Sequence, residues 1–98
     1  MIEKRAAREQ AEINIARLTK KIVSQLYPKI RREIKKAVKS GMIGCFVAFD
    51  SDNRDLLVQV CKSLEDVMFE DGYRTACIIS EDCNAYNGKY SAQIHIGW

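Results

Sequence analysis

Residues 90–98 read YSAQIHIGW, and their alternation decides the fold class of the chain. Apolar and polar side chains alternate along this stretch, which is the pattern of a β-strand with one buried face. The side chains expected on the buried face are Tyr90, Ala92, Ile94, Ile96 and Trp98, and those expected on the other face are Ser91, Gln93, His95 and Gly97. The chain is therefore predicted to contain a sheet that is covered on one side.

The segment before this strand predicts a hairpin. Residues 81–88 are polar and end in Asn87-Gly88, a typical turn, and Tyr73 to Ser80 is expected to be the preceding strand. Further upstream, an apolar i, i+4, i+8 pattern ending before Gly72 predicts a helix. Its apolar residues are Leu56, Leu57, Val60, Cys61, Leu64, Val67 and Met68.

A short apolar run, GCFVAF at 44–49, precedes that helix and predicts another strand, which we expect to be buried on both faces. Asp52 or a neighbouring residue is expected to cap the helix. Across the expected sheet and helix, the predicted core residues are Phe46, Val47, Leu57, Leu64, Ile94 and Ile96.

The first 40 residues predict a long amphipathic helix, because they contain one Pro, no Gly and an apolar stripe. Pro28 is expected to kink or break this helix, and Gly41 to end it. The fold class is thus predicted as α+β, with a basic helical arm (1–40) followed by a β-α-β-β body (41–98) with a three-stranded sheet, together one folding unit. The middle helix should cover one face of the sheet.

Composition indicates a globular chain. Its 98 residues suit a single core, and 47% are hydrophobic and 30% charged. Met1 to Arg5 is charged, with no apolar run behind it, so we expect neither a signal peptide nor a membrane span. The expected location is the cytoplasm.

The residues that usually carry chemistry are few. The four cysteines (45, 61, 77 and 83) form no C-x-x-C pair and His95 is the single histidine, so we expect reduced structural thiols and no zinc site. Asp50, Asp52 and Asp55 lack the Gly and distal Glu of a calcium loop. No nucleophile or phosphate-loop motif occurs. We therefore expect a protein that is not an enzyme and that uses no metal or cofactor.

Charge is distributed unevenly along the chain. Residues 1–40 hold twelve Lys or Arg against four Glu, a net charge of +8, whereas residues 41–98 hold four against nine, a net charge of −5. Such asymmetry predicts either a charged partner for one half or complementarity between the halves.

Two groups of charged residues are candidates for a binding site. A helical wheel places Arg17, Lys21, Arg32, Lys35 and Lys39 opposite the apolar stripe, as expected for a surface that contacts phosphates and equally for a solvated helix face. Glu65, Asp66, Glu70 and Asp71 lie in the last turns of the middle helix, where the helix dipole disfavours negative charge. These acids could contact a basic partner or the basic arm of a second copy.

The length of the arm predicts an assembly. A helix over residues 3–27 is about 38 Å long at about 1.5 Å per residue, and a body of residues 41–98 is about 26 Å across. The arm must therefore overhang the body. Covering its apolar stripe predicts a homodimer through the N-terminal helices.

Several sequence features together resemble small bacteriophage-encoded accessory proteins. They are Lys-Ser-Gly at 39–41, Asp-Gly-Tyr at 71–73 and the closing Ile94-His95-Ile96-Gly97-Trp98. The resemblance implies a phage origin and a non-enzymatic role of the anti-CRISPR or anti-defence kind. It carries over no functional residue, since such proteins share no common fold. With a phage origin, the expected cytoplasm is that of the host cell.

Three functions follow as hypotheses. The leading one is a binding protein that inhibits or redirects a host nucleic-acid-handling or defence complex, so that the partner is a host protein or a nucleoprotein complex. The second is direct binding of RNA or DNA by the basic helix, although Tyr27 is its single aromatic residue for base stacking. The third is a sponge for a nucleotide signal at a dimer interface.

Overall fold

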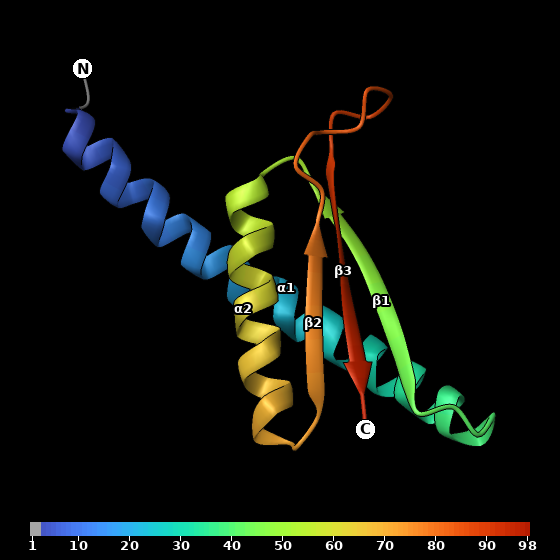
Figure 1. Ribbon diagram of the computed structural model, residues 1–98. Helices are drawn as coiled ribbons and strands as arrows, with labels where there is room; N and C mark the ends of the chain where they lie inside the picture. Colours follow the sequence, from blue (N-terminus) through green and yellow to red (C-terminus); the bar gives the residue numbers. More distant parts are fainter. Residues whose placement is uncertain (1–2) are drawn as a thin grey trace.

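The computed structural model describes residues 3–98, and its elements confirm the α+β class (Figure 1). Their order along the chain is α1 (Lys4–Lys39), β1 (Gly44–Ser51), α2 (Arg54–Glu70), β2 (Arg74–Ile79) and β3 (Tyr90–Gly97). The long N-terminal helix and the hairpin between β2 and β3 are present as predicted.

The three strands form one antiparallel sheet in the order β1-β3-β2. The last strand is therefore the central one, with Phe46 opposite His95 on one side and Ala76 opposite His95 on the other. The outer strands run parallel to each other, and α2 connects them. The apolar and polar side chains of β3 alternate because successive residues point to opposite faces of the sheet and the helices cover one of them.

Both helices pack on the same face of the sheet and form the core with it (Figure 1). Ile30 of α1 is completely buried beside Val60 and Leu64 of α2 and Ile94 of β3. The predicted core residues Val47, Leu57, Leu64, Ile94 and Ile96 are all buried. The core is thus built from every element, and the second half of α1 is part of the body.

The prediction that Phe46 is buried is wrong, because this side chain is 55% exposed. Alternate residues of β1 point to opposite faces, and Cys45, Val47 and Phe49 take the covered one. No element covers the other face within residues 3–98. The expectation that β1 is buried on both faces is therefore wrong.

The helix was expected to kink or break at Pro28, and the break is wrong, because α1 runs through this residue without interruption. A kink there stays a prediction. Pro28 is exposed, so the carbonyl of Ser24, which loses its intrahelical donor, can be hydrated. Leu26, Tyr27 and Ile30 pack on the core on either side of the proline. Tertiary packing therefore holds the helix together where local propensity disfavours it.

The ends of the helices follow the predicted signals. Gly41 has a φ of 74° and ends α1, a conformation that glycine adopts without strain. The cap of α2 is Asn53, whose side-chain oxygen accepts a hydrogen bond from the backbone N–H of Leu56 at 3.2 Å. The chain can therefore turn sharply between α1, β1 and α2.

The first turns of α1 project beyond the body (Figure 1). The molecule measures 57 × 33 × 18 Å and has a radius of gyration of 15.4 Å, compared with about 13 Å for a compact chain of this length. Residues 4–14 are all exposed. Neither helix in the described part of the chain is long and apolar enough to cross a membrane.

Replacing Leu64 by Ala should lower the free energy of unfolding by about 2–5 kcal/mol, because its completely buried side chain would leave a cavity. Phe69→Ala on the same helix is the control, since Phe69 is 78% exposed. Urea unfolding followed by circular dichroism measures both. A loss of less than about 1 kcal/mol for Leu64→Ala would contradict the packing of α2 on the sheet.

Replacing Pro28 by Ala should raise the stability of the protein, by up to about 3 kcal/mol, since proline inside a helix costs about that much. The same urea measurement tests this. An unchanged or lower midpoint would mean that α1 depends on a bend at this residue.

Candidate functional site

The five basic residues predicted as a binding surface lie on the solvent side of α1. Arg17, Lys21, Arg32, Lys35 and Lys39 are all exposed. The buried residues of the helix, Thr19, Ile30 and Ala37, are on its opposite side. We call these five residues the basic ridge. It extends about 33 Å at about 1.5 Å per residue.

Further cations strengthen the ridge. Lys20, Lys29, Arg31 and Lys36 are exposed too, so residues 17–39 hold nine cations. The only acid in this range is Glu33, which is half-buried and pairs with Lys36 at 3.7 Å. No ion pair within residues 3–98 involves any member of the ridge. Its positive charge is therefore largely uncompensated.

The projecting start of α1 has a different character. Its cations alternate with acids and pair with them one turn away, with Arg5 3.6 Å from Glu9 and Arg8 3.3 Å from Glu12. The charge of the N-terminal half is thus concentrated on the part of α1 that packs on the body, which places it on a rigid support.

The three predicted acids lie on α2, where Glu65 is half-buried and Asp66 and Glu70 are exposed. None of them forms an ion pair with the ridge. The structure therefore keeps the two groups of charges as separate surfaces of the helical layer.

Asp71 has a partner that the sequence did not reveal. The hydroxyl of Tyr27 on α1 donates a hydrogen bond to its carboxylate at 3.1 Å. This bond raises the pKa of Tyr27 above its ordinary value of 10.0, and the negative charge of Asp71 acts in the same direction. The acid at the end of α2 thus links the two helices, and we do not count it with the binding residues.

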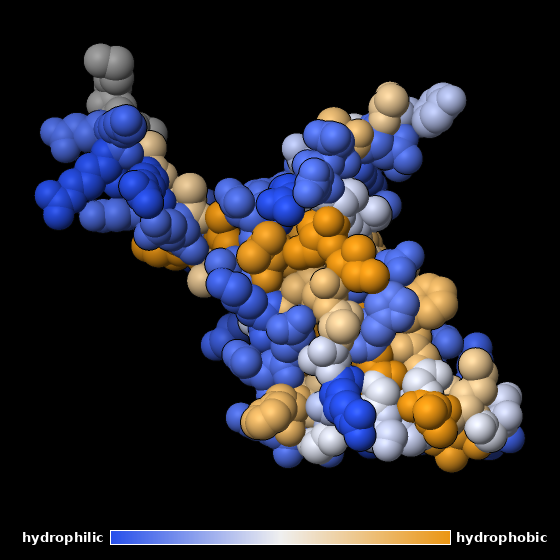
Figure 2. Space-filling model, viewed as in Figure 1, coloured by the Kyte–Doolittle hydropathy of each residue, from blue (hydrophilic) through white to orange (hydrophobic). Residues whose placement is uncertain are grey.

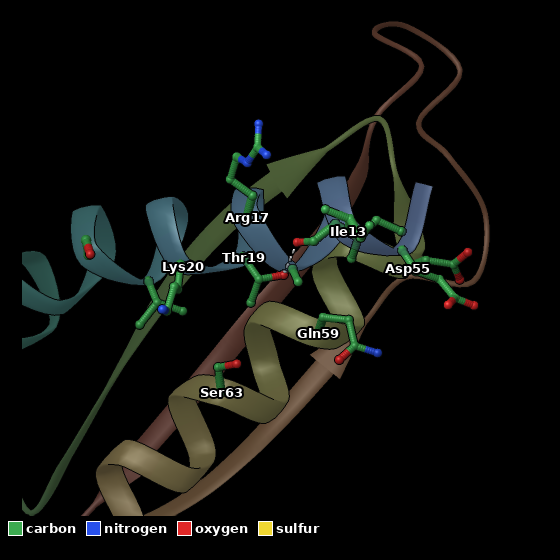
Figure 3. Close-up of a pocket in the computed structure, with 12 residues that line it drawn as sticks. Ile13, Arg17, Thr19, Lys20, Asp55, Gln59 and Ser63 are labelled. Carbon is green, nitrogen blue, oxygen red and sulfur yellow. Dashed lines mark hydrogen bonds between the residues drawn. The ribbon is translucent and has the colours of Figure 1, made fainter. Parts of the chain in front are cut away.

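A groove of about 1020 Å³ opens where α1 diverges from α2 (Figure 3). Ile13 and Val23 contribute apolar surface, and Gln59 and Ser63 of α2 line the opposite side. The buried hydroxyl of Thr19 donates to the carbonyl of Ile15 at 2.7 Å and is thereby satisfied within the helix. In Figure 3 the guanidinium of Arg17 points away from α2, toward solvent.

The apolar stripe of α1 is covered more completely than predicted. Ile15 and Ile22 pack against the core of their own chain. The exposed large apolar residues on the N-terminal half of the helix are Ile13 (54%) and Leu18 (43%). A dimer through the N-terminal helices remains a prediction, and it would depend on these two residues.

The cysteines and the histidine take the positions predicted for them. Cys45 and Cys77 lie on strands, Cys61 on α2 and Cys83 in the loop before β3, and all four are free. A thiol–thiol hydrogen bond with Cys61, together with burial, raises the pKa of Cys77 and keeps it protonated. His95 lies on the uncovered face of the sheet, with Nε2 3.2 Å from Oε1 of Gln93.

Neither these groups nor their neighbours form a metal site. Within residues 3–98 no three His, Cys, Asp or Glu side chains are placed to hold a metal ion together. The arrangement offers exposed surfaces for binding.

Comparison with known proteins adds no relative. No protein-family model, no curated protein and no solved structure matches the chain.

Replacing Asp71 by Asn should lower the pKa of Tyr27 toward 10.0, because the charged acceptor is lost. The protonated phenol is favoured in the folded protein, so its contribution to stability exists below the ordinary pKa and is lost as the pH rises through the raised value. Ultraviolet titration of each chain against its Tyr27→Phe variant isolates this group. An unchanged curve would show that Asp71 does not hold Tyr27.

Proposed function

We propose that the chain is a non-enzymatic binding protein whose basic ridge docks on the phosphate backbone of nucleic acid within a host nucleic-acid-handling or defence complex. Docking there would inhibit or redirect that complex. The observation that carries the proposal is the nine cations against one acid over residues 17–39, on a single helix held rigidly against the body.

The length of the ridge suits a polyanion. Double-stranded DNA carries about one charge per 1.7 Å of its axis, so a ridge of about 33 Å can follow many phosphates in succession. The ridge has two groups of cations, one near Arg17 and one near Lys39. The uncharged residues Ser24, Gln25 and Pro28 lie between them. No aromatic residue belongs to the ridge, which favours contact with the backbone over reading of bases.

The acids of α2 give this docking a direction. A phosphate backbone that approached across α2 would be repelled by Glu65, Asp66 and Glu70. Nucleic acid would therefore approach α1 from the side that faces away from α2. In a nucleoprotein complex the same acids can contact basic side chains of the protein component. The resemblance to phage accessory proteins agrees with such a role.

Direct binding of free RNA or DNA is the second candidate, and the same ridge supports it. The two candidates differ in what remains bound after nuclease treatment. A protein retained from bacterial lysate after nuclease identifies a complex as the target, whereas complete loss with the nucleic acid identifies direct binding.

Reversing Arg32, Lys35 and Lys39 to Glu should weaken binding to a 20-base-pair duplex by at least about 100-fold, because several phosphate contacts become repulsive. The matched control reverses Lys4, Arg5 and Arg8, three cations of the same helix that lie outside the ridge. Fluorescence anisotropy at 50 and 200 mM salt measures both variants, and binding of the native chain should fall steeply between these concentrations.

Equal losses in both variants would mean that net charge alone matters and that the ridge is no site. Reversing Glu65, Asp66 and Glu70 to Lys should leave duplex binding intact or strengthen it, and should weaken retention of a protein partner. If retention is unchanged, these acids do not contact the partner.

A further inference from the structure

The side of the sheet away from the helices carries an apolar centre. We call it the open face; it consists of Phe46, Ala48 and Asp50 of β1, Arg74, Ala76 and Ile78 of β2, and Ser91, Gln93 and His95 of β3. Phe46 is 55% and Ile78 is 61% exposed. In the view of Figure 1 α1 runs behind the sheet, and Figure 2 shows apolar side chains gathered around the end of β2 and the upper part of α2. A solvated face normally carries polar residues at these positions, so the apolar centre indicates an interface.

The strand register fixes where each side chain of this face lies. Phe46, His95 and Ala76 form one row across the sheet, and Ala48, Gln93 and Ile78 form the next. In the first row the ring of His95 stacks on that of Phe46, with the ring centroids 5.4 Å apart.

The charges of the open face lie at diagonally opposite corners. Arg74 lies on β2 at one end of the sheet, in the row of Gly44 and Gly97. Asp50 lies on β1 at the other end, in the row of Ser91. No ion pair within the described chain involves either residue. The face is therefore neutral overall, although the protein carries a net charge of +3.

We propose that a second copy of the chain docks on the open face, sheet against sheet, with the strands crossing at about 70°, nearer to the orthogonal than to the aligned sheet packing. A two-fold axis lying between the sheets along the line from Phe46 to Ile78 places each of these side chains against its own counterpart. The same rotation places Arg74 of each copy over Asp50 of the other. The face is thus complementary to itself in charge, and its two largest apolar side chains meet across the axis.

Other arrangements lack this complementarity. An axis along the opposite diagonal brings Arg74 against Arg74 and Asp50 against Asp50. An axis along or across the strands places both charges against uncharged residues. The second copy is also favoured over a strand of nucleic acid, because the face has one cation and one anion and an aliphatic centre.

The open face is small, about 20 Å along the strands and about 10 Å across them. A stable interface usually buries about 800 Å² on each partner, so the dimer should be weak and should form in the micromolar range. The basic ridges of both copies remain on the outside, and the dimer does not depend on the proposed function.

A charge exchange in the full chain tests the proposal. Sedimentation equilibrium from about 10 to 500 μM should show the native chain dimerising, and Arg74→Asp and Asp50→Arg should each weaken the dimer at least tenfold, by placing like charges together. The double variant should recover most of the native affinity. Phe46→Ala should lose the dimer, whereas Phe69→Ala, an exposed aromatic on α2, should not.

Circular dichroism of every variant must match the native spectrum, and the double variant keeps the test valid if one single variant unfolds. The proposal is overturned if the native chain stays monomeric at 500 μM, or if the double variant is no better than the single ones. It is also overturned if Ile13→Glu with Leu18→Glu abolishes the dimer while Phe46→Ala does not, which would assign the contact to the N-terminal helices. Loss of oligonucleotide binding by Phe46→Ala in a monomeric protein would assign the face to nucleic acid.

Discussion

The structure depends on the burial of Ile30 between α2 and the sheet. This side chain joins the N-terminal helix to the core that Val60, Leu64 and Ile94 form. Without this contact, α1 would be a separate amphipathic arm whose apolar stripe is exposed to solvent. With it, two helices share one face of a three-stranded sheet, and the cations on the far side of α1 keep a fixed position relative to the acids of α2. The charge pattern of the surface is thus a consequence of how the core is packed.

Using both helices on one side leaves the other side of the sheet bare. A sheet of three strands can be stable with one covered face, provided that the hydrophobic residues gather there. In β3 they do, because even-numbered residues from Ala92 to Ile96 are apolar and odd-numbered ones are polar. In β1 both faces are apolar. The proposed dimer through the open face accounts for this unequal pattern of neighbouring strands.

The same contrast explains what the sequence could and could not predict. Elements with a single clear period, such as α2 and β3, were predictable together with their buried residues, since one face was obviously apolar. The exposure of Phe46 was not predictable, because a strand that is apolar at every position does not show which face is covered. Pro28 misled for a different reason: its local cost is real, but packing by Tyr27 and Ile30 exceeds it. The basic ridge followed from the helical wheel, whereas Tyr27 with Asp71 required tertiary contacts that no local pattern encodes.

The two surfaces left uncompensated by folding differ in kind and point in opposite directions. The ridge on α1 is charged and extended, so its interactions are long-ranged and sensitive to salt. The open face is apolar and short, so it acts only on contact and tolerates salt better. If the open faces pair, the ridges of the two copies lie on opposite outer sides of the dimer. Each dimer could then hold two segments of one polyanion, and a ridge with modest affinity would gain from the second attachment. Pairing of the open faces would in this way strengthen binding by the basic ridges. This coupling gives both surfaces a role in the same function.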